Sequence, residues 1–458
     1  MAEGRGLENN LLNVRVGDPI FDFARRRVVS AAAERLGKEE RALLLGVQQL
    51  QLAAADNYFL HYSLHPIFAP SNPDELMRAI LEAQRKYAAT GAYRAARLVT
   101  VLDDALSLIH SIAFTRELVR QLLERMRTRL GGERLQRVLE RLGLGGGAQG
   151  GEAPPLALSE LGLSELAIES AVREAGEAAG SVTSAAKNIL DLCGGGVGKG
   201  VGDIHAVLDL ADAVLTVRGA EEVVALAKRI ADALPRFAAI RKQRGKRGAA
   251  FAGYALTSNP ERAAPREFAL PDELFYAKLA SGSLLRREML TVKEGAYYVL
   301  LDKSGSMDGE KTVWSRSVAL ALLSVARRRH RRFLLRFFDG VPHDLLSDGD
   351  AVGLVKALLR VRPSGGTRID AALRAALGDL KRGFSELTNT IVIVTDGEDT
   401  VTVKPEELRE VGAALVAVMI HGSNEALRLL AERSGGRYMR ATLTERGALQ
   451  LVDMLRKR

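Results

Sequence analysis

Apolar and charged positions along the first half of the chain alternate at helical spacing. From about residue 19 to residue 246, apolar residues recur every three or four positions with charged residues between them, which is typical of helices with one buried face. The segments DELMRAILEAQRKY (74–87) and RELVRQLLERMRTRL (116–130) are examples. Asn72 and Pro73 form a helix-start signal before the first, and glycines 131–132 end the second. We therefore predict a mostly α-helical N-terminal region.

A glycine-rich segment interrupts this region. LGLGGGAQGGEAPP (142–155) is typical of a flexible linker or long loop. We therefore divide the chain into a helical region at 1–141, a linker at 142–157, a second helical segment at 158–250, a connecting segment at 251–290 and a C-terminal domain at 291–458. The helical segments could form one domain or two, and we found no internal repeat.

The pattern changes in the C-terminal part. Apolar runs that lead into turns occur at 297–306, 390–397 and 414–422, another apolar run lies at 333–338, and a weaker strand is expected at 437–442. Helical patterns lie between them at 314–329, 369–381, 405–412 and 425–434, and a last helix leads to residue 458. Buried strands that alternate with helices indicate a mainly parallel sheet covered on both faces. We predict an α/β doubly wound, Rossmann-like domain.

Composition narrows the class of protein. The 458 residues suffice for two or three domains, and 47% of them are hydrophobic. We found neither a signal peptide nor a membrane span, and the single Cys193 excludes an intrachain disulfide, so we expect a cytoplasmic protein. The net charge of +9 is compatible with a nucleic-acid or membrane-surface partner, but we favour solvated arginine-rich helix faces because no RNA-binding motif accompanies the charge.

Polar residues cluster where the predicted strands end. DKSGS supplies Asp302, Ser304 and Ser306 after the first strand, TDGED supplies Asp396 after the third, and the loop SGGTRID supplies Thr367. In doubly wound folds a ligand site lies beyond the carboxyl ends of the strands. All five side chains offer oxygen, the donor that Mg²⁺ or Mn²⁺ prefers. We predict a metal site with one open coordination position for an acidic group of a partner.

These residues resemble a known family. DKSGSM at 302–307, the threonine of GGT and the aspartate of TDG match the metal-ion-dependent adhesion site of von Willebrand factor A domains, over about residues 290–458. The resemblance implies that Ser304, Ser306 and Thr367 contact the metal. It also implies that Asp302 and Asp396 bind it directly or through water, and that a bound partner often supplies the sixth ligand.

The domain order adds a looser resemblance. A helical N-terminal region before a C-terminal A domain, joined through PDELFYAKLASGSLLRREML (271–290), is similar to the CoxE-like and ViaA-like partners of MoxR-type AAA+ ATPases. This implies a non-enzymatic, chaperone-like adaptor that takes part in the remodelling or maturation of target proteins. The ATPase is then the expected protein partner.

Two alternatives remain. RNA-binding proteins of the Ro type also join helices to an A domain, although their helical repeats have no counterpart here. A metal-dependent hydrolase would use the same open coordination position, but no general base or nucleophile is evident in the sequence. Each alternative predicts a ligand that can be tested.

Four other features have weaker functional interpretations. CGGGVGKG (193–200) lacks the spacing of a phosphate-binding loop, and His61 and His65 have the spacing of zinc ligands but no third partner. RRRHRR (327–332) should lie at the opposite end of the domain from the metal. Asp370, Glu398 and Asp399 are candidate residues for the rim of the metal site, although we favour solvated loop acids for Glu398 and Asp399.

Overall fold

A computed structural model describes residues 7–144, 157–193, 204–233, 244–245, 250–290, 294–329, 331–383, 388–397 and 399–456. The chain forms two compact units, one of Met1–Ala225 with Val355–Arg360 and one of Leu226–Leu354 with Val361–Arg458. The glycine-rich segment at 145–156, the glycines at 194–200, most of the basic stretch at 236–248 and Glu398 lie outside the described residues.

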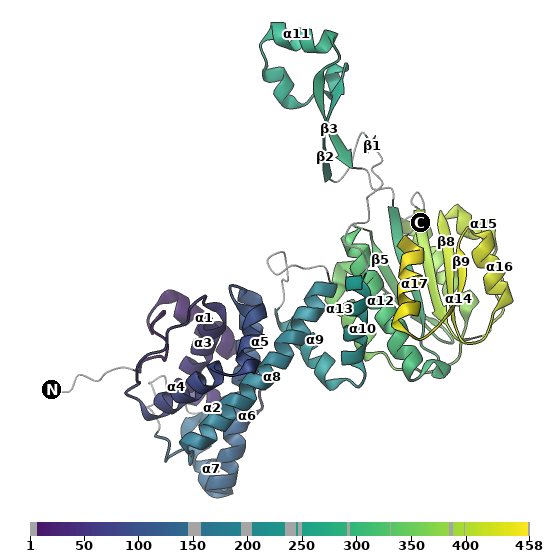
Figure 1. Ribbon diagram of the computed structural model, residues 1–458. Helices are drawn as coiled ribbons and strands as arrows, with labels where there is room; N and C mark the ends of the chain where they lie inside the picture. The colour runs from purple at the N-terminus through teal and green to yellow at the C-terminus, as the bar shows by residue number, and fades with distance from the viewer. Residues whose placement is uncertain are drawn as a thin grey trace. The chain divides into compact units, whose positions relative to one another are not determined.

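The first unit is helical, as predicted. Its helices are α1 (Pro19–Ala33), α2 (Lys38–Gly46), α3 (Gln48–Tyr62), α4 (Glu75–Ala88), α5 (Gly91–Thr100), α6 (Asp104–Leu130), α7 (Gly132–Leu139), a π-helical turn (Glu140–Leu144), α8 (Glu165–Leu192) and α9 (Ile204–Thr216); α10 (Ala220–Ala233) begins in it. The long helix α8 packs against α4, α5, α6 and α9. Helices from both sides of the glycine-rich segment therefore belong to one unit (Figure 1).

Polar side chains fix where these helices begin. The carboxylates of Asp74 and Asp103 accept hydrogen bonds from the backbone N–H groups of Met77 and Leu106, at the starts of α4 and α6. The capping residue of α4 is therefore Asp74, and the prediction of Asn72 as the cap is wrong. Asn72 is buried instead, and its amide accepts from Asp74 N–H and donates to the carbonyl of Glu8, so it holds the preceding chain.

Within the part of the chain that the structure describes, no third metal-binding side chain lies with His61 and His65, in agreement with the missing third partner in the sequence. His61 is fully buried and its ring stacks on that of His110 with centroids 3.6 Å apart. His65 is exposed, and its carbonyl accepts a hydrogen bond from Asn13. No group of three or more His, Cys, Asp or Glu side chains in the described ranges is arranged to hold a metal ion. Among the same residues, no helix is long and apolar enough to cross a bilayer.

A small antiparallel sheet lies mostly where we expected a connecting segment, and its first strand lies at the end of the segment that we predicted to be helical. Its strands β1 (Arg244–Gly245), β2 (Ala250–Thr257) and β3 (Leu284–Leu290) are ordered β1-β3-β2, and they flank two 3₁₀ turns (Pro260–Arg262 and Pro265–Ala269) and α11 (Asp272–Ala280). Inside this lobe, the buried carboxylate of Glu267 bonds the ammonium of Lys278 at 2.6 Å.

The second unit contains a six-stranded sheet, which confirms the predicted α/β class. Its strands are β4 (Glu294–Asp302), β5 (Phe333–Phe338), β6 (Pro342–Ser347), β7 (Thr388–Thr395), β8 (Ala413–Ile420) and β9 (Arg437–Ala441), in the order β6-β5-β4-β7-β8-β9. All neighbours pair in parallel except β5 and β6. The antiparallel edge strand β6, which is only partly buried, was not predicted.

Helices cover both faces of this sheet (Figure 1). They are α12 (Glu310–Arg328), α14 (Ile369–Gly383), α15 (Pro405–Glu410), α16 (Glu425–Arg433) and α17 (Glu445–Arg456), with 3₁₀ turns at Gly305–Met307 and Asp348–Asp350. A further helix, α13 (Ala351–Arg360), was not predicted from the sequence, and its residues Val355–Arg360 belong to the first unit. Alternate strand residues such as Tyr298, Leu300 and Ile393 pack against α14, α15 and α16 in one core. On α12, the indole of Trp314 donates to the carbonyl of Thr444 just before α17.

Candidate metal centre

The predicted site lies at the carboxyl edge of the central strands. Strand β4 ends at Asp302, and Asp396 directly follows the neighbouring strand β7. From β4 the chain proceeds to β5 on one side and later returns to β7 on the other, so the strand order reverses between these two strands. This is the position at which α/β sheets leave a crevice for a ligand.

Hydrogen bonds join four of the five predicted ligands into one chain. One carboxylate oxygen of Asp302 accepts from the backbone N–H of Ser304 at 2.8 Å. The hydroxyls of Ser304 and Ser306 lie 3.1 Å apart, and the Ser306 hydroxyl donates to a carboxylate oxygen of Asp396 at 2.8 Å. Oxygen atoms from two different strands therefore converge within hydrogen-bonding reach of one another.

Thr367 approaches the same place from a third segment. Its loop is held by backbone hydrogen bonds from Ser364 to Lys303 and from Gly305 to Gly365, at 2.6 and 3.1 Å. A Cβ atom placed on Gly397 would lie only 3.0 Å from the Thr367 hydroxyl, so this hydroxyl packs directly against the residue after Asp396. The glycine of TDG is therefore needed for close approach.

The site is buried at its base and open at its rim. Asp302 and Ser304 are 4% and 2% exposed, whereas Ser306 is exposed and Thr367 half-buried. Burial raises the pKa of Asp302, although hydrogen bonds from Thr395 and Ser304 act in the opposite direction and the charge of Asp396 adds to the rise. A cation beside Asp302 would offset the cost of burying this carboxylate.

Two participants were missed from the sequence. The Thr395 hydroxyl donates to the second carboxylate oxygen of Asp302 and accepts from Gly397 N–H. The ammonium of Lys311, in the first turn of α12, lies 2.6 Å from Asp396 and donates to the carbonyl of Ser306 at 3.0 Å. A lysine one helical turn beyond DKSGSM was the available signal, but its reach depends on how α12 leaves the loop.

A second ion network borders the site. Lys303 donates to Asp339, which follows β5, at 2.8 Å, and His343 Nε2 lies 3.0 Å from the same carboxylate. Burial alone would raise the pKa of Asp339, but the hydrogen bonds from Lys303, Val341 and His343 hold it at about 2. These contacts hold Lys303, the second residue of DKSGS, whose side chain bonds Asp339 and none of the five predicted ligands.

The candidate rim acids hold loops together. Asp399 accepts from the backbone N–H of Ile369 at 2.8 Å, and Asp370 accepts from the N–H groups of Thr402 and Val403. We interpreted Asp399 as a solvated acid, which is wrong for its carboxylate because that group caps the start of α14.

The residues present fit a divalent cation. Two carboxylates and three hydroxyls form an all-oxygen set, which suits Mg²⁺ or Mn²⁺ and not a soft metal. The Asp396 carboxylate is already paired with the Lys311 ammonium, which shows that this position accepts positive charge. Bound metal would supply a Lewis-acidic point at the open rim.

The basic turn at 327–332 lies at the other end of the strands, as predicted. Arg331 is buried, donates to the carbonyls of Gly295 and Thr388, and its guanidinium lies 3.8 Å from the centre of the Tyr297 ring. These residues belong to the amino-terminal ends of β4 and β7. Arg331 therefore connects the amino-terminal ends of these two strands and is not a solvated residue of the turn.

Comparison with known proteins gives a family match over part of this domain. Residues 297–398 match the von Willebrand factor type A domain family. An uncharacterized protein of Methanocaldococcus jannaschii is 32% identical over 112 residues, which are 24% of this chain and 27% of that protein. A putative VWFA domain-containing protein of Acidianus two-tailed virus is 25% identical over 161 residues, which are 32% of this chain and 16% of that protein. The matches thus span about a quarter or less of these relatives.

Solved structures are similar at lower identity. A von Willebrand factor type A protein from Catenulispora acidiphila is 18% identical, with a TM-score of 0.28 over 38% of this chain and 43% of that chain. Proximal thread matrix protein 1 from the mussel byssus is 16% identical, with a TM-score of 0.26 over 35% of this chain and 45% of that chain. The family match therefore assigns residues 297–398 to a von Willebrand factor type A domain, and the rest of the six-stranded sheet lies outside that match.

Proposed function

We propose that this chain is a non-enzymatic adaptor that binds a protein partner through a divalent cation held by Asp302, Ser304, Ser306, Thr367 and Asp396. The observation that carries the proposal is the convergence of these oxygen donors at one sheet edge, with Ser306 linked to Asp396 at 2.8 Å. The two serines and the threonine are neutral, so a bound Mg²⁺ would keep affinity for one more anionic ligand. A carboxylate from a partner has that chemistry.

The arrangement favours docking over catalysis. The donors and their immediate neighbours are carboxylates, hydroxyls and the ammonium of Lys311, and the near histidine, His343, is engaged with Asp339. A hydrolytic reaction would need a base positioned to activate water. The proposal therefore assigns binding, and no turnover, to this site.

The expected partner is a MoxR-type AAA+ ATPase, because of the similarity to the CoxE-like and ViaA-like proteins described above. An adaptor of that kind would present its metal to the ATPase or to a client protein, and its helical unit would bind the other party. Cytoplasmic location is part of the same proposal.

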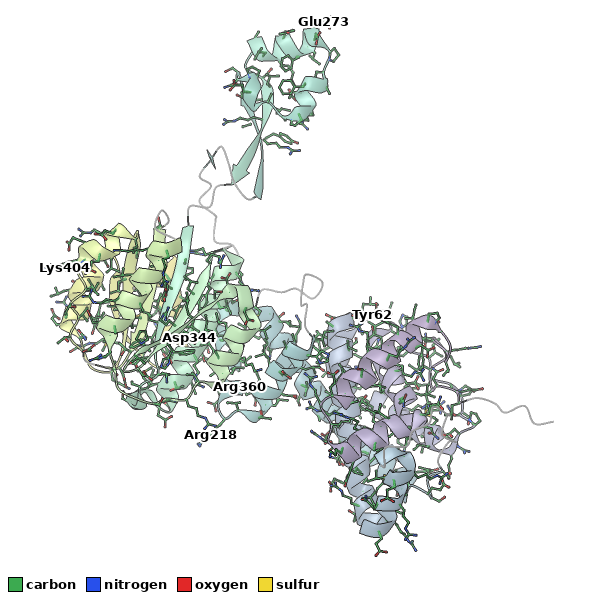
Figure 2. The ribbon with its side chains drawn as sticks, turned by 180° about the vertical axis from the view of Figure 1, so that it is seen from behind. Tyr62, Arg218, Glu273, Asp344, Arg360 and Lys404 are labelled. Atoms are coloured by element: carbon green, nitrogen blue, oxygen red, sulfur yellow. The ribbon has the colours of Figure 1, made fainter. Side chains whose placement is uncertain are left out.

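A binding experiment with a MoxR-type ATPase from the same organism tests this function. The full-length protein should retain the ATPase in Mg²⁺ buffer and release it in EDTA, and Asp302→Ala should fail to retain it. Asp344→Ala is the matched control, because Asp344 is an exposed carboxylate on β6 of the same unit (Figure 2). Equal retention by wild type and Asp302→Ala would remove the metal face as the docking site.

A further inference from the structure

Five large apolar side chains are exposed on neighbouring segments of the helical unit. We call them the apolar face: Leu12, Leu64, Ile67, Leu98 and Leu102, with exposed fractions of 46%, 56%, 54%, 88% and 63%. Single exposed leucines are common on proteins, but apolar residues gathered in one place mark interaction sites. These five side chains therefore indicate an interaction site only if they form one surface.

Hydrogen bonds to backbone carbonyls connect the segments of this face. The N–H of Leu12 donates to the carbonyl of Ile67 at 2.8 Å, and the guanidinium of Arg97 donates to the carbonyl of Leu64 at 2.9 Å. The N–H of Leu102 donates to the carbonyl of Tyr62 at 3.0 Å. Tyr62, labelled in Figure 2, ends α3 and precedes Leu64 by two residues. The five residues thus come from adjoining stretches of chain.

Leu102 has an unusual backbone conformation. Its φ angle is +58°, in the left-handed region where a side chain is disfavoured and glycine is not. The leucine side chain is 63% exposed, so it contributes little packing in return. Stability alone would favour glycine at this position. An exposed leucine there indicates that its side chain has a use outside the folded monomer.

Polar groups within the face are already satisfied. Arg97 donates to the carbonyls of Leu60, Ser63 and Leu64. The Asn13 amide donates to the carbonyl of His65 and accepts from Ile67 N–H. A partner could therefore remove water from this face without leaving buried polar atoms unpaired, which is the main cost of covering a surface.

Positive charge borders the face. Arg94 is one helical turn before Leu98 on α5, and Arg15 follows Leu12 on the N-terminal segment; both are exposed, and neither has an ion pair within the described part of the chain. The neighbouring acids have partners: Asp18 and Asp103 accept hydrogen bonds at the starts of α1 and α6, and Asp104 lies 3.3 Å from Arg27. Among these charged side chains, the two arginines are therefore the ones left to pair with a partner.

We propose that the apolar face binds an acidic amphipathic helix of a partner protein. Leucine-sized anchors on such a helix would cover Leu64, Leu98 and Leu102, and its acidic residues would lie against Arg15 and Arg94. The proposal uses no residue of the metal site and does not depend on the function proposed above. The two binding surfaces can therefore be tested separately.

Selection from a peptide-display library tests the proposal. Random peptides of roughly 15 residues, enough for about four helical turns, are panned on the full-length protein and counter-selected on a Leu98→Ser, Leu102→Gly double variant. Selected peptides should carry apolar residues at helical spacing and a net negative charge. A synthetic peptide from the selection should bind each single variant about tenfold or more weakly than wild type.

Matched variants separate binding from folding. Leu166, on the first turn of α8 and 77% exposed, gives the control Leu166→Ser, which should bind as wild type does. Leu102→Gly should not lower the thermal midpoint, because glycine accepts the positive φ angle. Asp302→Ala should also bind the peptide normally, which separates this face from the metal site.

Four results would overturn the proposal. They are selection of no peptide, selection of basic peptides, concentration-dependent dimerisation that Leu98→Ser abolishes, and binding of anionic lipid vesicles that Leu98→Ser abolishes. The last two would assign the face to a second copy of the chain or to a lipid surface.

Discussion

The ammonium of Lys311 lies 2.6 Å from the carboxylate of Asp396, which is one of the two acidic groups of the candidate metal centre. The same ammonium donates to the carbonyl of Ser306. The centre therefore contains an internal cation that is fixed to α12. A divalent ion must either displace this ammonium or bind beside it, and both cost free energy through repulsion between like charges.

Lys311→Met should therefore strengthen divalent-cation binding. Removing one positive charge near the ion should lower the dissociation constant for Mn²⁺ by about tenfold, which corresponds to about 1.4 kcal/mol. Isothermal titration calorimetry measures this directly. Lys381→Met, which removes an exposed lysine paired with Glu410 on the same unit, is the control and should have no effect. Weaker binding by Lys311→Met would mean that the lysine supports the metal.

Asp302→Asn should remove the stabilisation by Mg²⁺ without lowering the stability of the metal-free protein. Burial raises the pKa of Asp302, so its ionised form costs stability at neutral pH in the absence of metal. The amide keeps the acceptor for Ser304 N–H, and we expect the metal-free variant to be equal to wild type or more stable by about 1 kcal/mol.

Thermal unfolding with and without Mg²⁺ checks this prediction. Wild type should gain thermal stability on adding Mg²⁺, because only the folded state holds the ion, and Asp302→Asn should gain none. Asp344→Asn should behave as wild type. A large loss of stability in metal-free Asp302→Asn would show that this carboxylate has a structural role.

His110 should make the helical unit sensitive to acid. Burial lowers its pKa to about 3, and burial also lowers the pKa of the stacked His61. An unfolded histidine takes up a proton near its ordinary pKa of about 6.5, so the stability that neutral His110 provides is complete above that pH. It is lost as the pH falls toward 3.

His110→Leu should reduce this loss. Between about pH 6.5 and about pH 4.5 the variant should lose about 2 kcal/mol less than wild type, since each pH unit in this range contributes up to about 1.4 kcal/mol. Urea unfolding at both pH values measures the difference, and His65→Gln, at an exposed histidine, is the control. An unchanged pH dependence would mean that His110 titrates normally in the folded protein.

The RNA-binding alternative makes an opposite prediction about salt. Many surface arginines already pair with acids, for example Arg127 with Glu39 and Arg428 with Glu425. These paired arginines do not form a free basic surface for RNA, although the chain has a net charge of +9. We expect no RNA binding by fluorescence anisotropy even at about 50 mM salt. Binding that weakens steeply with salt would favour the alternative.

The strand pattern predicted which loops meet at the carboxyl edge of the sheet, because the order of the strands and the positions of their ends determine this. Asp302 and Asp396 end or follow continuous apolar runs, and buried parallel strands must end at one edge. The contact between Lys311 and Asp396 could not be predicted, since it depends on the direction in which α12 leaves the loop. The edge strand β6 was missed because its residues are only partly buried and follow no clear alternation.

Other features depend on tertiary contacts that a sequence does not reveal. Nothing in VTVLDD distinguishes Leu102 from its neighbours, yet Leu102 alone in that segment has a positive φ angle. Asn72 looked like a helix cap, but Asp74 takes that position because Asn72 bonds a segment more than sixty residues earlier. Long-range partners, and not local propensity, decided both cases.

Calorimetric titration of Mn²⁺ into the full-length protein tests the central claim most directly. The account predicts one site per chain in wild type and in Asp344→Ala, and no detectable binding in Asp302→Ala or Asp396→Ala. Thr367→Ala should bind more weakly, because it lacks one of the five oxygen donors. Equal Mn²⁺ binding by wild type, Asp302→Ala and Asp396→Ala would contradict the assignment of this edge as a metal centre.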